Sequence, residues 1–509
     1  MYSVIQFVDD QLNGITMYRL VLYYLIFLLV AAFFLSVFNV LTYDPFSLVL
    51  TVAFLLAVSA ATNRVFSSIF KVPANVESVY ITALILALII TPLQSLNDLW
   101  FLAWAAVLAN ASKYIVAIKG KHLFNPAAFA VALTYFTINQ SASWWIGSGA
   151  MLAWVLLGGL LVVRKLGRFD MVFSFLAVSA ATIFVSSLFT GGDFLSTTRQ
   201  SIVYSPLLFF AFIILTEPLS TPPTRRLRIM YGALVGFLFT PQFHFDTFYI
   251  TPEVAILIGN LFSYAVGSKD KLVLKLKEKN RLAPDTYEFV FPAPRRFRFV
   301  PGQYMEWTLA HPDTDGRGNR RYFTIASSPG ERNLRLGVKF NPKPSTFKKA
   351  LLAMDRDTEI IASQLAGDFV LPEDPQQKVV LMAGGIGVTP FRSMIKSLLD
   401  NRQRRPITLF YTAPTVNDFV YQDVFDRARS ELGITTIYSV TDNSDLPPSW
   451  TGRVGRVSAE LIRSAVPDYR NCLFYISGPR RMVDSLAAAL HKLGVAGHQI
   501  KTDYFAGLA

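Results

Sequence analysis

The chain has 509 residues, a length that favours at least two domains. Hydrophobic residues make up 52% of it and charged residues only 16%, against roughly 25% in an average soluble domain, which excludes a wholly soluble protein. The net charge of +13 does not indicate nucleic-acid binding, because much of the excess lies in short loops between apolar segments. The average hides a division: residues 1–266 are dominated by apolar runs, whereas residues 269–509 have the composition of a soluble protein.

The apolar segments predict an all-α membrane domain over residues 1–266 with ten transmembrane helices. The first segment lacks a small-residue cleavage site, which favours a membrane helix over a signal peptide. The fifth segment and the last three are short for a span of about 20 residues, which predicts broken or tilted helices. The segments lie near residues 20–40, 46–66, 75–93, 98–118, 125–138, 144–163, 171–190, 201–216, 228–241 and 251–266.

Basic residues are concentrated in every second loop between these segments, with Arg199 as the main exception. Because cytoplasmic loops carry the excess of Lys and Arg, both termini are predicted to lie in the cytoplasm. The expected location is a bacterial-type inner membrane that the chain crosses many times, with the soluble half on the cytoplasmic side.

An internal repeat links the third segment to the eighth and the fifth to the tenth. The third segment ends at Thr91–Leu93 and the eighth at Thr216–Leu219, both with a Thr followed by a Pro. The fifth opens at Phe124–Ala127 and the tenth at Ile250–Glu253, both with a Pro. An offset of five segments is odd, so we predict two inverted five-helix repeats with a site near their interface. The alternative is that these prolines merely end helices.

The membrane half resembles a known family of membrane proteins. The stretches Lys121–Ala127, Thr216–Thr224 and Tyr231–Leu234 resemble NqrB of the sodium-pumping NADH:quinone reductase and RnfD of the Rnf complex. The resemblance implies ten helices and flavin bound inside the membrane domain. Members usually carry covalent FMN on a long loop after the fifth span, but here that loop is only about Thr137–Ser143. We therefore expect FMN or riboflavin held noncovalently, near Asn125, Thr216, Glu217, Ser220, Thr221 and Thr224.

The soluble half opens with stretches of alternating apolar residues that predict strands, at Leu272–Leu276 and Thr286–Phe291. Pro301–Tyr304 then precedes the strand Arg321–Thr324, in which an Arg stands beside aromatic residues. A guanidinium can pair with pyrophosphate while a ring packs against isoalloxazine, so this strand suits a flavin nucleotide. Ser345–Phe347 begins a predicted helix whose N-terminal amides could hold phosphate.

A glycine-rich pattern follows in the C-terminal part of this half. The buried run Val379–Ala383 leads into Gly384–Pro390 and then a predicted helix, which lets the backbone approach a pyrophosphate. A further buried strand, Cys472–Ile476, ends at Ser477–Pro479, and the chain closes on Asp503–Gly507.

This ordered set resembles the ferredoxin–NADP reductase superfamily. The resemblance implies a six-stranded antiparallel β-barrel that binds FAD over residues 270–372, and a doubly wound α/β domain that binds NADH or NADPH over residues 376–509. It implies three catalytic residues: Thr324 near flavin N5, Phe505 near the isoalloxazine face, and Ser477, where many relatives have cysteine, lining the nicotinamide pocket. The expected cofactor-binding residues of this half are Gln303, Tyr304, Arg321, Tyr322, Phe323, Thr324, Lys339, Ser345, Thr346, Gly384, Gly385, Gly387, Thr389, Pro390, Gly478, Pro479, Met482 and Phe505.

Metal centres are not expected. The single cysteine, Cys472, excludes a disulfide framework and a cluster held by about four thiolates within the chain. Of five histidines, only His122 and His244 lie in the membrane half, at opposite predicted ends, where two haems would need two facing pairs. Glu217 and Glu253 lie at predicted helix breaks, where each could bind a coupling cation or proton or simply face loop arginines.

Three functions fit these features. The first is electron transfer from NAD(P)H through FAD and a membrane flavin to a quinone or an extracytoplasmic carrier protein; the others are a redox-driven Na⁺ or H⁺ transporter and a membrane-tethered flavin reductase. We expect NADH as the donor, because Tyr411–Asp418 holds no basic residue for a 2′-phosphate and Asp418 would repel one. Electrons are expected to cross the bilayer. The terminal acceptor, the coupling ion and the oligomeric state are left open by the sequence.

Overall fold

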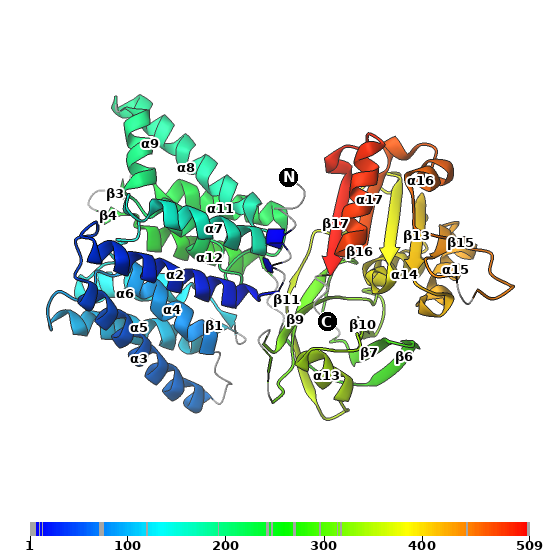
Figure 1. Cartoon of the computed structure of the whole chain (residues 1–509), viewed down its shortest axis with the longest axis horizontal. Helices are drawn as coiled ribbons and strands as arrows, with labels where there is room; N and C mark the ends of the chain where they lie inside the picture. Colours follow the sequence, from blue (N-terminus) through cyan, green and yellow to red (C-terminus); the bar gives the residue numbers. More distant parts are fainter. Residues whose placement is uncertain are drawn as a thin grey trace. The chain divides into compact units, whose positions relative to one another are not determined.

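The computed structural model divides into two compact units, Met1–Lys269 and Asp270–Ala509, which are described separately (Figure 1). It describes residues 7–9, 11–12, 14–70, 76–118, 121–191, 193–240, 244–245, 248–267, 271–294, 297–312, 314–315, 318–443 and 446–505, without the side chains of residues 76, 121, 190, 244, 245, 248, 249, 504 and 505.

The first unit consists of helices that follow the apolar segments of the sequence, with two short hairpins (Figure 1). The helices are α2 (Met17–Val37), α3 (Pro45–Phe70), α4 (Val76–Ile89), α5 (Asp98–Ile115), α6 (Pro126–Ile138), α7 (Leu152–Leu166), α8 (Phe169–Thr190), α9 (Phe194–Val203), α10 (Leu207–Phe209), the π-helix η1 (Phe210–Ile214), α11 (Arg225–Phe239) and α12 (Pro252–Val266). The hairpins are β1 (Ala117–Ile118) with β2 (Lys121–His122), and β3 (His244–Phe245) with β4 (Phe248–Tyr249).

Among the described residues, three helices are long and apolar enough to cross a membrane: α2, α3 and Phe169–Phe189 of α8. A fourth candidate is the pair Phe194–Val203 and Leu207–Ile214, which bends by 65° at its break. The other apolar helices are shorter, because prolines and irregular turns interrupt the segments that the sequence presents as continuous. The expected ten full spans are therefore not confirmed by helix length.

The largest departure from the expected helices lies at residues 144–151, which form an irregular stretch before α7 instead of its first turns. Trp144 N–H donates to Ile89 O at 2.8 Å and Ile146 N–H donates to Leu88 O at 3.3 Å. The Trp145 indole adds bonds to Ala87 O and Ile90 O, both at 3.0 Å. This stretch therefore satisfies the carbonyls that the early end of α4 leaves without helical partners.

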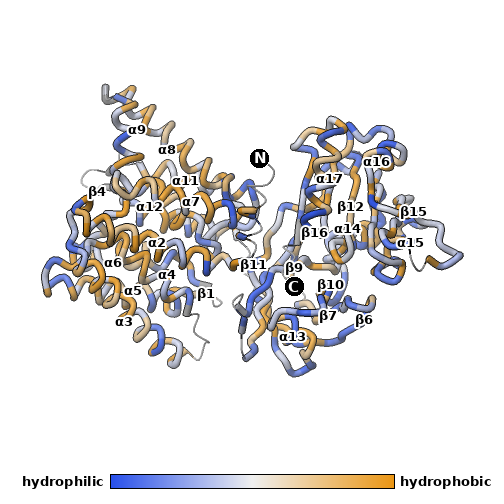
Figure 2. Tube along the Cα trace, viewed as in Figure 1, coloured by the Kyte–Doolittle hydropathy of each residue, from blue (hydrophilic) through white to orange (hydrophobic). Residues whose placement is uncertain are grey.

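The tube of this unit is largely orange, the colour of hydrophobic residues (Figure 2), and large apolar side chains are exposed on the outside of its helices. Phe34 on α2 is 54% exposed, Trp100 on α5 74% and Leu188 on α8 67%. Large apolar side chains exposed along several helices would be costly in water, so they mark a surface made for an apolar surrounding. Together with the apolar spans, this surface is that of a membrane protein.

Glycines bring some of these helices unusually close. A Cβ on Gly232 of α11 would lie 2.4 Å from Met171 O of α8, and one on Gly236 would lie 2.5 Å from Phe175 O. Their spacing of four residues lets the backbones of α8 and α11 meet directly, as small residues do between membrane helices.

The second unit opens with two antiparallel sheets, of order β10-β7-β6 and β5-β11-β8-β9, with the helix α13 (Thr346–Ala353) beside them. A barrel of six strands was expected. Instead, the chain bends at Leu276–Lys277, so that β5 before the bend belongs to one sheet and β6 after it to the other. The strands are β5 (Leu272–Lys275), β6 (Glu278–Ala283), β7 (Thr286–Pro292), β8 (Tyr304–Thr308), β9 (Arg320–Thr324), β10 (Asn333–Lys339) and β11 (Glu359–Ala366).

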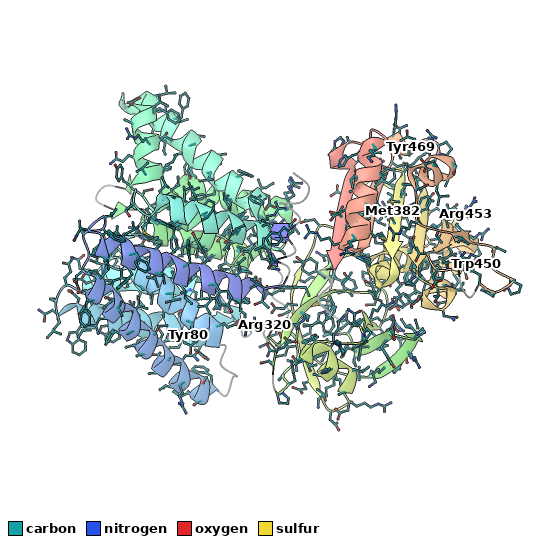
Figure 3. All side chains as sticks on the ribbon, viewed as in Figure 1. Tyr80, Arg320, Met382, Trp450, Arg453 and Tyr469 are labelled. Atoms are coloured by element: carbon teal, nitrogen blue, oxygen red, sulfur yellow. The ribbon has the colours of Figure 1, made fainter. Side chains whose placement is uncertain are left out.

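A six-stranded parallel sheet of order β15-β14-β13-β12-β16-β17 follows, with helices on both faces, as a doubly wound fold predicts. Met382 of β12 is buried in the middle of this sheet (Figure 3). The strands are β12 (Val379–Gly384), β13 (Ile407–Ala413), β14 (Thr435–Val440), β15 (Arg453–Val454), β16 (Leu473–Pro479) and β17 (Ile500–Phe505). The helices are η2 (Gly385–Val388), α14 (Thr389–Asp400), η3 (Val416–Asp418), α15 (Gln422–Leu432), α16 (Ala459–Ala465), η4 (Tyr469–Asn471), α17 (Arg480–Lys492) and η5 (Gly497–Gln499).

Candidate functional site

The parallel sheet reverses its winding direction between β12 and β16, and such a switch point is where doubly wound sheets bind ligands. The turns after the two strands meet there, because a Cβ on Gly387 would lie only 2.4 Å from Ser477 O. Ser477 is fully buried, and its hydroxyl has no hydrogen-bond partner among the described residues. An unsatisfied buried hydroxyl at this edge fits a polar ligand such as the carboxamide of nicotinamide.

The expected nucleotide-binding residues gather around these turns. Gly384 ends β12 and Gly385 begins η2 with a φ of 53°, which favours glycine. Gly387 lies in η2, Thr389 and Pro390 begin α14, and Gly478 and Pro479 close β16. The Met482 sulfur would lie 2.4 Å from a Cβ on Gly384, so a larger residue there would require the Met482 side chain to move. Phe505 ends β17, but its side chain falls outside the described residues.

The expected flavin residues lie along the paired strands β8 and β9. Thr324 is buried and lies opposite Tyr304 in the ladder, and the Tyr304 ring makes an edge contact with Tyr322 at 5.7 Å. Gln303 accepts from Val300 N–H at 2.8 Å, and its carbonyl accepts from Ile325 N–H at 3.0 Å. These bonds fix the strand ends on both sides of Thr324.

Arg321, Phe323, Ser345 and Thr346 meet at the N-terminus of α13. The Arg321 guanidinium lies 5.2 Å from the centre of the Phe347 ring, which in turn lies 6.0 Å from the Phe323 ring. Ser345 caps the helix by accepting from Lys348 N–H. A cation beside a helix N-terminus suits an anionic group such as a pyrophosphate.

Two residues that the sequence did not indicate also lie at this helix end. Asp315 accepts from Thr346 N–H at 3.1 Å and pairs with Arg321 at 3.6 Å. The His311 ring lies within hydrogen-bond distance of the Thr346 hydroxyl, at 3.1 Å. The Asp315 carboxylate thus contacts the donors that a phosphate would use. Its position in a turn of polar residues gave no sequence signal for this contact.

Lys339, an expected cofactor-binding residue, is the last residue of β10. Its ammonium pairs with Asp418 at 3.3 Å, and Asp418 also accepts from the Thr415 hydroxyl at 2.8 Å. Lys339 therefore joins β10 to η3 instead of pointing at the helix end of α13. Because Lys339 compensates the charge of Asp418, this carboxylate is no longer an argument against the 2′-phosphate of NADPH.

Asp503 lies beside Ser477 in the ladder of β17 with β16. Burial raises the pKa of this carboxyl from 3.8 to about 6, because the ionised form loses hydration there. An acid with this pKa at the switch point changes its charge in the near-neutral range.

In the helical unit, two of the three stretches that carry the family resemblance meet, Lys121–Ala127 and Thr216–Thr224. The His122 ring nitrogen Nε2 lies 3.2 Å from Glu217 Oε1, although 95 residues separate them. Ser220 donates to the other oxygen of Glu217 at 3.0 Å. Thr216 and Thr221 are also buried, and their hydroxyls donate to Phe212 O and Pro218 O. Thr224 precedes α11 without a side-chain cap hydrogen bond.

Asn125 extends this polar region. Its side chain caps α6 by accepting from Ala128 N–H, and its own N–H donates to the Asn260 side chain of α12 at 2.8 Å. The Asn260 amide then donates to the Tyr231 hydroxyl at 3.1 Å. Asn125, Asn260 and Tyr231 are all buried, so the sequence-predicted Asn125 belongs to a network that spans α6, α11 and α12.

Lys113 of α5 is a further charged residue that sequence reasoning missed. Its ammonium donates to Ser78 O at 2.9 Å and to the Ser78 hydroxyl at 3.2 Å. Glu217 contributes to its electrostatic environment. A lysine inside an apolar helix was visible in the sequence, but only packing identifies its partners. We call Lys113, His122, Asn125, Glu217, Ser220, Tyr231 and Asn260 the helical polar cluster.

A separate polar contact lies at the start of α12. Glu253 is only 2% exposed and accepts from the Trp144 indole at 3.2 Å.

Across the part of the chain that the structure describes, no group of three or more His, Cys, Asp or Glu side chains is placed to hold a metal ion.

Comparison with known proteins agrees with this division. Residues 145–268 match the NQR2, RnfD, RnfE family, and residues 381–488 match the oxidoreductase NAD-binding domain. A flavohemoprotein of Bacillus cereus is 28% identical over 215 residues, which are 41% of this chain and 53% of that protein. NADH-cytochrome b5 reductase 1 of Neosartorya fischeri is 26% identical over 264 residues, which are 48% of this chain and 84% of that protein.

Among solved structures, the Amycolatopsis cytochrome P450 reductase GcoB is similar with a TM-score of 0.41 and 22% identity, over 47% of this chain and 71% of that one. The chain spans about half the length of the first curated relatives that it matches, at 53%. The relatives support binding of FAD and NAD(H) by the soluble half. The two matches are consistent with a chain that joins a membrane domain similar to the NQR2, RnfD, RnfE family to an oxidoreductase NAD-binding domain.

Proposed function

We propose that the chain passes electrons from NADH through FAD to a flavin in the membrane half and on to a quinone or an extracytoplasmic carrier protein. The observation that carries this proposal is the buried Ser477 hydroxyl at the switch point of an NAD-binding sheet, in a chain whose other half is a membrane domain with a buried polar cluster. A mere membrane anchor would not need such a cluster, which is costly in an apolar surrounding.

The residues of the soluble half divide between two cofactors. We assign residues 270–372 to FAD, with Arg321, Ser345 and Thr346 at the pyrophosphate and Thr324 and Phe505 beside the isoalloxazine. We assign residues 376–509 to the nicotinamide nucleotide, with the turns at Gly384–Gly387 and Ser477–Pro479 around it. The bound cofactors supply the hydride chemistry. The chain supplies the binding contacts, the orientation and a buried site.

NADH is the proposed donor. No basic residue lies in Tyr411–Asp418 after β13, and Asp442 follows the neighbouring strand β14 at the same edge of the sheet. A carboxylate there would repel a 2′-phosphate, whereas it can accept from a ribose hydroxyl. Steady-state kinetics with NADH and NADPH, on the wild type and on Asp442→Ala, would decide the donor. The proposal requires a higher kcat/KM for NADH and a reduced preference in the variant.

For the membrane half, residues 1–266, we propose noncovalent FMN or riboflavin at the helical polar cluster. The contact of His122 with Glu217 supports this placement, because it joins both stretches of the family resemblance. The neighbouring Asn125, Thr216, Ser220, Thr221 and Thr224 are the proposed hydrogen-bonding groups. The short segment 137–143 leaves no long loop there for a covalent flavin.

We also propose ten membrane-crossing segments in two inverted repeats, with the soluble half in the cytoplasm of a bacterial-type inner membrane. The packing of α2 on α7 and of α6 on α12 supports the repeat, because each pair holds equivalent positions in the two halves. Broken helices such as the pair of α9 with α10 and η1 suit this arrangement, since irregular backbone in a membrane has to be buried by neighbours.

Redox-driven transport of Na⁺ or H⁺ is the second candidate. It is favoured by Glu253, a buried carboxylate at the start of α12 with an indole as its hydrogen-bond partner. A carboxylate inside a membrane helix is a candidate for a proton or cation site. The measurement is Na⁺ uptake or acidification in proteoliposomes during NADH oxidation, compared with Glu253→Gln.

Reconstitution in liposomes tests the main proposal. NADH is supplied outside and an impermeant electron acceptor is trapped inside, with orientation checked by protease access to the soluble half. A hydrocarbon core about 30 Å thick is too wide for one direct electron hop, so reduction of the trapped acceptor requires a centre within the bilayer. If protein in the correct orientation reduces a lipid quinone but never the trapped acceptor, the chain is a one-sided quinone reductase.

A further inference from the structure

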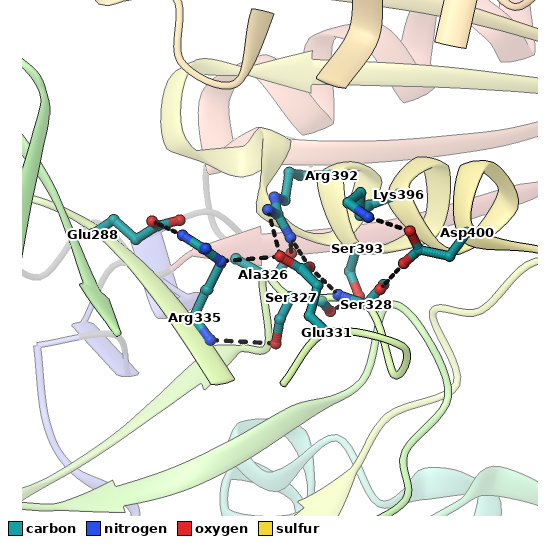
Figure 4. Close-up of polar contacts among 10 residues, drawn as sticks. All are labelled: Glu288, Ala326, Ser327, Ser328, Glu331, Arg335, Arg392, Ser393, Lys396 and Asp400. Carbon is teal, nitrogen blue, oxygen red and sulfur yellow. Dashed lines mark hydrogen bonds and ion pairs between the residues drawn. The ribbon is translucent and has the colours of Figure 1, made fainter. Parts of the chain in front are cut away.

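In the soluble unit, the segment that follows the proposed flavin strand is bound to the helix that follows the nucleotide turn (Figure 4). The segment is Ile325–Glu331, directly after Thr324, and the helix is α14, directly after the turn at Gly385–Val388. We call this set of contacts the brace. It connects two parts of the chain that belong to different sheets and to different proposed cofactors.

The centre of the brace is Arg392 of α14, which is 5% exposed. Its guanidinium forms two hydrogen bonds to the Glu331 carboxylate, one of them at 3.0 Å. The same guanidinium donates to Ala326 O at 3.0 Å, two residues past Thr324. One side chain therefore holds both ends of the segment against α14.

Two further hydrogen bonds flank this charge pair. The Ser393 hydroxyl donates to Ser327 O at 2.6 Å, and the Ser328 hydroxyl bonds to the Asp400 carboxylate at the other end of α14. Asp400 is itself paired with Lys396. The segment thus contacts α14 over its whole length.

Glu331 is held in its ionised form by its neighbours. Burial opposes its ionisation, but the hydrogen bond and charge of Arg392, with Ser328 N–H and Arg335, outweigh burial and lower the pKa of the carboxyl. Arg335 bonds to Glu331 at 3.0 Å and is anchored in turn by Glu288 of β7. Because a buried pair is costly to break, the brace resists small rotations of one sheet against the other.

We propose that Arg392 and Glu331 are positioning residues, which hold the segment after Thr324 against α14 so that the two cofactor sites keep the alignment that hydride transfer needs. This inference rests on the proposed binding of FAD and NADH. A misplacement of about 1 Å can slow an aligned reaction about 100-fold, so a brace of this kind affects the rate more than the affinity. The alternative is that the brace only stabilises the fold.

Arg392→Met separates these two roles. It removes the cross-connection while Glu331 keeps its bonds to Arg335 and to Ser328 N–H, which lie on its own side of the brace. Arg392→Lys keeps the charge but not the fork of donors that reaches both Glu331 and Ala326. Ser393→Ala is a milder variant that removes one neutral bond, and it serves if Arg392→Met does not fold. The control is Asp468→Asn, which breaks an exposed pair with Lys378 within the parallel-sheet part.

Three quantities are measured on the full chain in detergent: the rate of FAD reduction by NADH in stopped flow, the NADH dissociation constant from the same titration, and amide hydrogen exchange in the protein without nucleotide. In Arg392→Met we expect reduction to slow about 10- to 100-fold, with the dissociation constant changed less than about threefold and FAD content unchanged. Amide exchange in Arg392→Met should accelerate in both 325–331 and 389–400. The reduction rate and the exchange rates of Arg392→Lys should lie between those of Arg392→Met and the wild type. Those of Asp468→Asn should match the wild type.

An unchanged reduction rate, a loss of rate that only follows loss of FAD, or unchanged exchange in the two segments would each overturn the positioning role. These outcomes differ from failure of the proposed function itself, in which the wild type would not bind FAD or would not be reduced by NADH.

Discussion

Asp315 makes the proposed pyrophosphate site different from an open anion site. Its carboxylate accepts from Thr346 N–H and pairs with Arg321, the donors that we assign to FAD. FAD has to displace this carboxylate before its own phosphates can bind.

We therefore predict that Asp315→Asn binds FAD more tightly than the wild type, by about 3- to 30-fold, because a neutral amide competes less for Arg321. The measurement is a flavin fluorescence titration of the full chain after FAD removal. Glu359→Gln on β11 is the matched control, since it removes one exposed negative charge from the same sheet. Equal or weaker affinity in Asp315→Asn would show that Asp315 does not compete with the flavin.

Asp503 predicts a pH dependence. Its folded-state pKa of about 6 lies above the ordinary value of 3.8, so the folded state holds the proton more tightly than the unfolded state does. Stability is therefore lost as pH rises from about 4 through about 6. At pH 7.5, Asp503→Asn should raise the free energy of unfolding by about 1–3 kcal/mol. It should therefore release FAD at a higher temperature than the wild type, with little difference near pH 4. Flavin fluorescence during heating measures this, and Asp357→Asn on an exposed turn should show no such pH-dependent gap.

At the scale of elements, the two glycines of the nucleotide turn play different roles. Gly387 is tight, because a Cβ there would lie 2.4 Å from Ser477 O and 2.6 Å from Gly478 Cα, whereas a Cβ on Gly385 would meet no atom within 4 Å. Gly385 has a φ of 53°, so alanine there costs only the strain of a left-handed residue, about 1 kcal/mol.

Gly387→Ala should consequently push the turns after β12 and β16 apart. We predict that it weakens NADH binding at least about tenfold and leaves FAD content unchanged, while Gly385→Ala has the smaller effect on affinity. Titration of both variants with NADH, followed by flavin absorbance, measures this. Similar losses in the two variants would show that contact between the turns does not govern the site.

The elements themselves were predictable to different degrees. Hydropathy located the helices of the first unit, since apolar runs and their interruptions are local properties of the chain. The irregular stretch 144–151 was expected to be helical because Trp144–Ile146 is as apolar as a helix, and only its hydrogen bonds to the free carbonyls of α4 explain its turns. Likewise, the alternation over Leu272–Leu276 predicted a strand but not the bend at Leu276–Lys277, which depends on the partner strands found on its two sides.

At the scale of the whole molecule, the proposal requires more than one flavin per chain. We predict FAD plus at least one FMN or riboflavin, all released by acid denaturation and identified by chromatography. Arg321→Ala should lose FAD and keep the second flavin. Asn125→Ser, which retains a side chain able to cap α6, should do the reverse. A single flavin per chain would favour a tethered reductase, and a flavin that stays on a membrane-half peptide would contradict noncovalent binding.

The sequence by itself determined the division into an apolar and a soluble half, the family that each half resembles, and the glycine-rich turns that end buried strands. These features are written in local composition and spacing, which a chain carries whether or not it is folded. The enzyme class follows from the same patterns, because nucleotide binding uses glycine turns for close approach of the backbone and an Arg beside aromatic residues for side-chain contacts.

Only the tertiary structure decided which side chains meet. His122 and Glu217 are 95 residues apart, Asn125 and Asn260 are 135 apart, and Arg392 and Glu331 are 61 apart. Likewise, Lys339 pairs with Asp418, 79 residues further along the chain, a contact that the sequence did not indicate. Such contacts depend on the crossing of helices and on strand order, which follow from the packing of the whole core, so no local pattern at either residue announces its partner.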